Sequence, residues 1–279
     1  MMEALAAIAK FVLYAGAFAC AGTALAAASL RRFLVDLNNR APAVIRISAA
    51  VTLIACATSA IILMARLGGA FDPTIASILA ETPPGFAIAL QMDGALVLLC
   101  TAGLRGAWSG LAVAGAVALL ASFAVNGHAA SVDLVSTIVA FLHVAAAAWW
   151  FGALLFLHTA CSFLASQALA DLVRAFSQFA LAIVINLIVA GTLLVLTLVD
   201  FNHDPWFGDY AQVLSIKICF AAMVVGLAAY NKFRLTPLIA KGDAIATRAL
   251  RRSIVLEITL IFAVLAATAF LTTFTSPHA

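Results

Sequence analysis

Long apolar stretches, separated by short polar segments, make up most of the chain. Eight of them hold about 20 mostly apolar residues or more, the length that a helix needs to cross a bilayer. They lie at roughly 4–30, 44–65, 86–104, 107–125, 134–164, 173–199, 210–230 and 250–274. None has the alternating pattern of a membrane β-strand, so helices are the expected spanning elements. The pattern predicts an all-α fold: a polytopic membrane helix bundle with about eight transmembrane helices, forming one integral membrane domain over residues 1–279.

The amino-acid composition also indicates that lipid surrounds most of the chain. Hydrophobic residues make up 66% of the chain and charged residues only 10%, against about 25% charged residues in soluble domains. The net charge of +3 gives no sign of a nucleic-acid partner, because the basic residues sit in short clusters between apolar stretches. Glu3 precedes the first stretch and Arg31 and Arg32 follow it, which is the pattern of a retained span rather than a removed leader.

The positions of the basic residues predict the topology. Most of the fifteen Lys and Arg residues fall in alternate loops. These are Arg31, Arg32, Arg40, Arg46, Arg105, Arg174, Lys232, Arg234, Lys241, Arg248, Arg251 and Arg252. The intervening loops hold only Arg66, while Lys10 and Lys217 lie within spans. Because cytoplasmic loops carry the excess of positive charge, both termini are expected on the outer, periplasmic side.

Histidines gather toward the predicted outer side. His128, His203 and His278 fall at or beyond the outer ends of spans. His143 lies ~10 Å inside the fifth span, and His158 lies ~22 Å further along the same helix. An isolated loop histidine is usually an ordinary polar residue, but an ionisable group at membrane depth is a candidate functional residue. Trp150 follows His143 by seven residues and is expected on the same helix face, where it could support the imidazole or simply pack.

Three charged residues are predicted at a comparable depth. Lys10, Asp93 and Lys217 each lie six or seven residues inside the outer end of a span, where opposite charges could pair. Cys100 shares a helix face with Asp93, and Met92 is adjacent to the acid. Thiolate and thioether suit Cu(I), whereas carboxylate and imidazole tolerate Cu(II). Charge pairing that fixes helix packing and a role in transport are equally open for these residues.

Other polar residues in the spans have simpler interpretations. Glu257 is an acid in the cytoplasmic half of the last span, where it could pair with a basic residue or accept protons. Asn186 and Asn231 are expected to form interhelical hydrogen bonds. The five cysteines, Cys20, Cys56, Cys100, Cys161 and Cys219, occur singly in apolar stretches, so each is expected to be a small buried residue outside any disulfide or zinc site. Nucleotide-binding, metalloprotease and hydrolase motifs are missing from usable contexts.

The chain resembles the copper resistance protein D family, most densely over about 120–279. The resemblance is carried by short segments in a fixed order. They are Gly127-His128-Ala129, His143 with Trp150-Phe151-Gly152-Ala153-Leu154, Tyr210 with Leu214 and Lys217, Asn231 with Leu235 and Pro237, and Leu250-Arg251-Arg252-Ser253 with Glu257. Ala153 and Ala211 stand where the family pattern has glycine.

The resemblance implies a multi-pass protein of the bacterial inner membrane, involved in copper uptake or tolerance beside a periplasmic copper-binding protein. It implies His128 and His143 as copper residues, and Lys217 and Glu257 as matching positions of unknown role. The resulting hypothesis is transport of copper, as Cu(I) or Cu(II), from periplasm to cytoplasm. His203 and His278 would assist at the mouth, and Met92, Asp93 and Cys100 would line the path.

Two alternatives stay open at this stage. One is a membrane oxidoreductase that binds haem or quinone, although His143 and His158 are too far apart on one helix to ligate the same iron. The other is a scaffold that receives copper without transporting it. The preferred interpretation is that the chain is not an enzyme. The sequence also leaves open whether copies of the chain form a homo-oligomer.

Overall fold

The computed structural model describes residues 2–30, 40–104, 106–126, 132–164, 166–198 and 208–274, and these ranges contain helices and no strands. The helices are α1 (Met2–Ser29), α2 (Arg40–Arg66), α3 (Pro73–Ala80), α4 (Pro83–Thr101), α5 (Ala107–Val125), α7 (Leu134–Phe163), α8 (Ser166–Leu198), α9 (Asp209–Tyr230), the π-helix η3 (Asn231–Leu235), α10 (Thr236–Ala240) and α11 (Ala244–Phe274). Eight helices in this part of the chain are long and apolar enough to cross a membrane, with α9, η3 and α10 forming one continuous span. The predicted eight-span helical architecture is confirmed.

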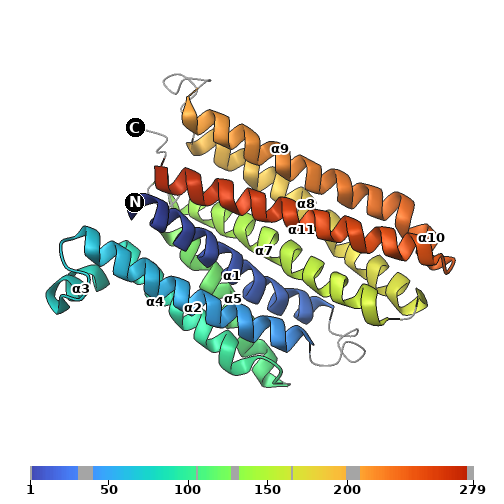
Figure 1. Cartoon of the computed structure of the whole chain (residues 1–279), viewed down its shortest axis with the longest axis horizontal. Coiled ribbons are helices and arrows are strands. Elements are labelled where there is room, and N and C mark those ends of the chain that lie inside the picture. Colours follow the sequence, from blue (N-terminus) through green and yellow to red (C-terminus); the bar gives the residue numbers. More distant parts are fainter. Residues whose placement is uncertain are drawn as a thin grey trace.

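The helices run side by side along one axis (Figure 1). α1 and α7 lie between α2, α4 and α5 on one side and α8, α9 and α11 on the other. α1 begins and α11 ends at the same end of the bundle, and α10 lies at the opposite end. We call the first of these the outer end and the second the inner end, following the orientation that the basic residues predict.

α1 and α7 approach each other closely at two glycines. A Cβ atom built on Gly22 of α1 would lie 1.8 Å from the backbone oxygen of Ala148, and one built on Gly152 of α7 would lie 2.0 Å from the backbone carbon of Gly22. Small residues permit this approach, as is common between membrane helices. Buried side chains from both helices then extend into two hydrophobic clusters, one in each half of the bundle.

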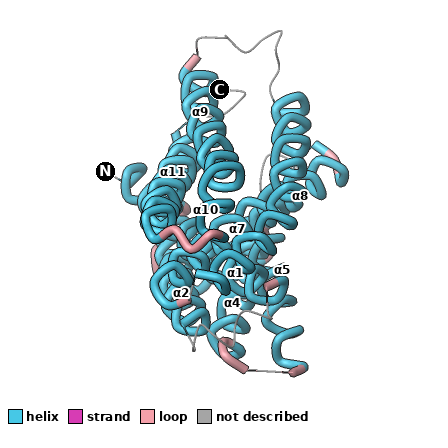
Figure 2. The backbone as a smooth tube through the Cα atoms, turned by 90° about the vertical axis from the view of Figure 1, so that its right-hand side faces the viewer, coloured by secondary structure: helices cyan, strands magenta, loops and turns pink. Residues whose placement is uncertain are grey.

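α8 and α9 lie at the edge of the bundle. α8 packs against α7 and α10, whereas α9 packs against α11 and η3, and the two helices scarcely contact each other. Figure 2 shows their tubes apart from one another. Only 6% of the most apolar window in each of these two spans is buried. Side chains between α8 and α9 therefore have room to border a cavity.

The cysteines divide into two groups. Cys20 and Cys56 are buried in the half of the bundle formed by α1, α2 and α4, as expected for small apolar residues. Cys161 is half-buried. Cys100 and Cys219 are exposed on the bundle surface, so the prediction of burial is wrong for them. In a membrane these two positions face the surrounding lipid, which a small apolar side chain also tolerates.

Candidate functional site

His143 lies where α7 packs against α8, within electrostatic range of Lys217 on α9. Asp133 caps the first turn of α7 by accepting a hydrogen bond from Ser136 N at 2.6 Å. Because of this bond, the pKa of the exposed Asp133 carboxyl is lowered. Nine residues after the start of α7, the His143 ring packs against the backbone of α8, where a Cβ atom on Gly191 would lie 3.2 Å from His143 Cε1. A glycine at position 191 thus leaves room for the imidazole.

The His143 ring has an unused nitrogen. Nδ1 is buried and has no hydrogen-bond partner among the described residues. The carbonyl of Leu187 on α8 approaches the ring but does not meet hydrogen-bond geometry. A buried nitrogen without a partner is uncommon in folded proteins and indicates a group that can serve a ligand. His143 therefore has the chemistry and the position of a binding residue.

Lys217 on α9 is the charged neighbour of His143. Its ammonium group is close enough to act electrostatically on the imidazole. The half-buried Lys217 forms no ion pair or hydrogen bond within the described ranges. The imidazole is neutral, so positive charge in this region comes only from Lys217 in its protonated form. Such a region binds a cation weakly unless further ligands join it.

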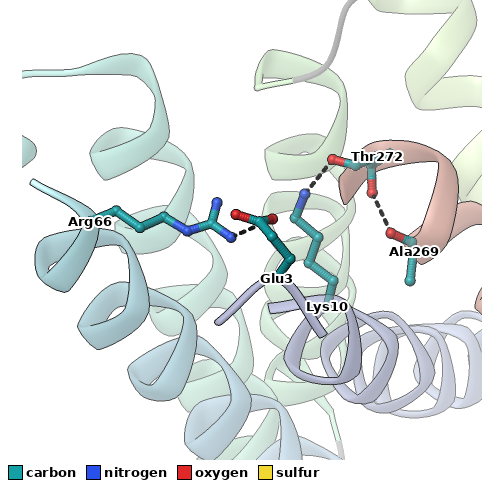
Figure 3. Close-up of polar contacts among 5 residues, drawn as sticks. All are labelled: Glu3, Lys10, Arg66, Ala269 and Thr272. Atoms are coloured by element: carbon teal, nitrogen blue, oxygen red, sulfur yellow. Dashed lines mark hydrogen bonds and ion pairs between the residues drawn. The ribbon is translucent and has the colours of Figure 1, made fainter. Parts of the chain in front are cut away.

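The predicted pairing of Lys10, Asp93 and Lys217 does not form among the described residues. Lys10 Nζ instead donates a hydrogen bond to the backbone oxygen of Thr272 on α11 at 2.6 Å (Figure 3). Beside it, Glu3 forms an ion pair with Arg66 at 2.8 Å (Figure 3). Equal depth in the membrane was therefore insufficient to predict pairing, because the three residues also had to face one another around the bundle.

Met92, Asp93 and Cys100 lie on the exposed face of α4. Asp93 and Cys100 share a face, as their spacing predicts, and Met92 is 40% exposed. α4 packs against α2 and α5 through its other face. The structure does not bring these side chains together with His143, which lies between α7 and α8. The proposed inward path lined by Met92, Asp93 and Cys100 is thus corrected: all three point away from the bundle interior.

A cavity of about 170 Å³ lies in the inner half of the bundle, bordered by α7, α8, α9, η3, α10 and α11. We call it the inner cavity. Its walls are mostly apolar, with a small polar group formed by Trp150, Glu257 and Asn231 and the hydroxyl residues Ser177 and Thr236. An apolar cavity with a few converging polar groups is the usual form of a binding site.

Glu257, Asn231 and Trp150 form the polar centre of this cavity. Glu257 is 1% exposed, and Asn231 Nδ2 donates a hydrogen bond to Glu257 Oε1 at 2.6 Å. The indole nitrogen of Trp150 approaches the carboxyl group but forms no hydrogen bond, and Asn231 Oδ1 also lacks a partner among the described residues. The predicted interhelical role of Asn231 is confirmed, whereas its partner, the acid of α11, was not foreseen.

The π-helix η3 places Asn231 in the cavity. Pro237 in α10 has no backbone N–H, so a regular helix cannot continue through this position unchanged. The chain forms the π-helical segment directly before it, and Thr236 Oγ1 donates to the Asn231 carbonyl at 2.9 Å. Single π-helical turns inside longer helices often occur at functional sites. Asn231 and Pro237 were visible in the sequence, but the local change of helix type was not.

Trp150 and His143 lie on the same side of α7, as their spacing predicts. Trp150 packs edge-on against Phe176 of α8 at 5.8 Å between ring centroids, and His143 packs against Gly191 of the same helix. Asn186 of α8 donates to the Leu142 carbonyl at 3.0 Å, which confirms its predicted interhelical bond. One face of α7 therefore carries both His143, nearer the outer end, and the aromatic wall of the inner cavity.

His128, His203 and His278 lie outside the described residues. Within the described ranges, no group of three or more His, Cys, Asp or Glu residues could hold a metal ion. The expected convergence of His128 on His143 thus stays a prediction. His158 is the other histidine in this part of the chain, and it is half-buried near the inner end of α7.

Two family models match the chain. The model described as copper resistance protein D matches residues 170–271, and the model described as copper resistance protein D-like, N-terminal domain, matches residues 1–134. The matched ranges include Lys217, Asn231 and Glu257 but not His143 or Trp150, which lie between them. The likeness thus extends through the first four spans, further than the sequence motifs indicated. No curated protein and no solved structure matches the chain.

Proposed function

The chain belongs to the copper resistance protein D family, and on this premise we propose that it carries copper ions across the bacterial inner membrane from the periplasm toward the cytoplasm. The single observation that carries the proposal is the buried imidazole of His143, whose Nδ1 has no partner in the described structure. Neutral imidazole is a common ligand of copper. At membrane depth, such a group is retained for function rather than for packing.

In this proposal, His143 is the copper residue of the membrane interior. His128 joins it from the segment that precedes α7, and His203 and His278 capture copper at the periplasmic mouth. A periplasmic copper-binding protein is the expected donor. The ion is the substrate of the protein, not a resident cofactor, so the site needs moderate affinity: binding must be favourable enough to load and weak enough to release.

Lys217 in its protonated form favours release of copper from His143 over retention of copper there. Two unit charges about 6 Å apart repel each other by roughly 3 kcal/mol at an effective dielectric constant of 20. A cation bound at His143 is destabilised by repulsion of this kind from the ammonium group of Lys217. No carboxylate forms an ion pair with Lys217 among the described residues. We infer that Lys217 keeps copper from remaining at His143.

The proposal predicts a specific loss of copper binding on His143→Ala. The purified variant is expected to bind copper at least tenfold more weakly than the wild type, since one coordinate bond in a low-dielectric site is lost. Cells that depend on this protein for copper uptake should accumulate correspondingly less copper. Isothermal titration and elemental analysis of cells measure the two effects.

His158→Ala is the matched control, because His158 lies on the same helix fifteen residues from His143. It is expected to keep wild-type binding and wild-type copper content. Equal binding by wild type and His143→Ala would remove His143 from the site. Equal losses in both variants would show a general effect of altering α7.

A further inference from the structure

Glu257 is a buried carboxyl group without a counter-ion. It is 1% exposed and lies near the middle of α11, a spanning helix. Asn231 forms a hydrogen bond with it, the indole nitrogen of Trp150 lies nearby, and no Lys, Arg or His in the described structure forms an ion pair with it. An ionised carboxylate in such surroundings is strongly unfavourable. The arrangement therefore requires the neutral, protonated carboxyl group.

The contact with Asn231 agrees with a protonated carboxyl group. The two side chains lie 2.6 Å apart, a distance that an O–H···O bond also allows. The oxygen and nitrogen of an amide can exchange places by rotation. With Oδ1 toward Glu257, the protonated carboxyl donates to it. Asn231 Oδ1 then has the partner that it otherwise lacks.

The inner cavity gives this proton a route. Its volume of about 170 Å³ is enough for several water molecules, each of which takes about 30 Å³. Trp150 Nε1 and the hydroxyl groups of Ser177 and Thr236 can bond such water. The cavity also borders Lys232 and Phe233, and Phe233 is 71% exposed. The lining of the cavity thus extends from the buried Glu257 to the exposed Phe233 of η3.

We propose that Glu257 and the inner cavity form a proton-binding site that is coupled to copper: the carboxyl group releases its proton to cavity water when copper occupies the region of His143. This inference rests on the proposed function. The proton leaves Glu257 Oε as hydronium in the cavity, and the carboxylate that remains is stabilised by the positive charge of the ion. When copper leaves, the carboxylate takes a proton back from the cavity.

No positively charged side chain pairs with Glu257 in the described structure, so in this proposal the copper ion balances the charge of its carboxylate. The polar groups that line the cavity beside Glu257 are Trp150 of α7, Ser177 of α8, Asn231 and Lys232 of η3 and Thr236 of α10, and Ser253 lies one turn before Glu257 on α11. His143 of α7, Lys217 of α9 and Lys10 of α1 lie on helices of the same bundle. Lys10 is committed to the Thr272 carbonyl near the outer end, and the Lys232 ammonium lies 5.7 Å from the ring centre of Phe233. Neither lysine forms an ion pair with Glu257.

The expected size of the coupling follows from the spacing on α7. His143 and Trp150 are seven residues apart, or ~10 Å along the helix, and Trp150 lies beside Glu257. A unit charge at that distance, at an effective dielectric constant of about 20, shifts a protonation equilibrium by roughly tenfold. A tenfold shift releases at most about half a proton per ion, at the pH midway between the pKa values of the group with and without copper. By reciprocity, ionised Glu257 strengthens copper binding by the same factor.

Two measurements on Glu257→Gln test the proposal. Glutamine keeps the shape and hydrogen-bonding capacity of a neutral carboxyl group but cannot ionise. In the infrared spectrum, the wild type should show a C=O band of a protonated carboxyl that is missing in Glu257→Gln. In weakly buffered solution, copper addition should release up to about half a proton per ion more from the wild type than from Glu257→Gln. Glu3→Gln, which alters the exposed acid paired with Arg66, should behave as the wild type in both.

Each outcome has a defined meaning. Equal proton release by wild type and Glu257→Gln over the whole pH range would overturn the coupling. A missing carboxyl band in the wild type would overturn the neutral state of Glu257. A wild-type protein that binds no copper would contradict the proposed function and the coupling together, and the infrared band would then still decide whether Glu257 holds a proton.

Discussion

Gly152→Ala is expected to destabilise the protein by about 3 kcal/mol, near the upper end of the usual cost of overpacking. The added Cβ atom would lie 2.0 Å from the backbone carbon of Gly22 and 2.2 Å from the nitrogen of Thr23. Both are backbone atoms, so no side chain can rotate away and α1 must separate from α7. These two helices hold the halves of the bundle together. Thermal unfolding in detergent, followed by size-exclusion chromatography, measures the loss.

Gly226→Ala provides the control for this prediction. Gly226 lies in α9, and a Cβ atom there meets nothing within 4 Å. Alanine also favours a helix over glycine by about 0.5–1 kcal/mol, so this variant should be as stable as the wild type or slightly more stable. Equal stability of Gly152→Ala and Gly226→Ala would show that α1 and α7 are not in the close contact described above.

Asn231→Leu is expected to cost about 2 kcal/mol of stability. The substitution removes the hydrogen-bond partner of a buried carboxyl group, and an unsatisfied buried group costs about 1–3 kcal/mol. Adding Glu257→Leu removes the second polar group as well, so the double variant should recover most of the lost stability. Chemical unfolding of the wild type, the two single variants and the double variant gives the coupling energy.

Asn186→Leu is the comparison for Asn231→Leu. Asn186 also donates one interhelical hydrogen bond, to the Leu142 carbonyl, but its contact is exposed. A loss of about 0.6 kcal/mol is expected, as is usual for such bonds in membrane proteins. If Asn231→Leu cost no more stability than Asn186→Leu, the hydrogen bond between Asn231 and the buried Glu257 would not stabilise the protein more than an exposed interhelical bond does.

The spans could be predicted because each requires only a long apolar stretch. The short helix α3 was missed, although Asp72 before Pro73 is a helix-start signal: Asp72 Oδ1 accepts from Thr74 N at 2.8 Å. Its eight residues are too few to cross a membrane, so a search for spans passes over it. Hydropathy also placed the start of the sixth span near residue 173, whereas the polar first turns extend α8 back to Ser166.

The direction in which each side chain points was harder to predict than its depth. In a membrane protein, both faces of a helix are apolar, because one meets protein and the other meets lipid. The prediction that Asp93 and Cys100 share a helix face was therefore correct, but the prediction that they line an inward path was wrong. The partner of Glu257 was hidden for a different reason: Asn231 is 26 residues away in sequence, and its position depends on the π-helix that precedes Pro237. His143 could be named as a candidate because an ionisable residue at that depth is rare.

Copper flux into liposomes that contain only this protein tests the central proposal most directly. Wild-type protein should carry copper across the bilayer faster than protein-free liposomes do, and His143→Ala should reduce the flux at least tenfold while His158→Ala leaves it unchanged. A copper-sensitive dye inside the liposomes records the rate. Flux no greater than in protein-free liposomes would contradict transport and favour a protein that receives copper without moving it.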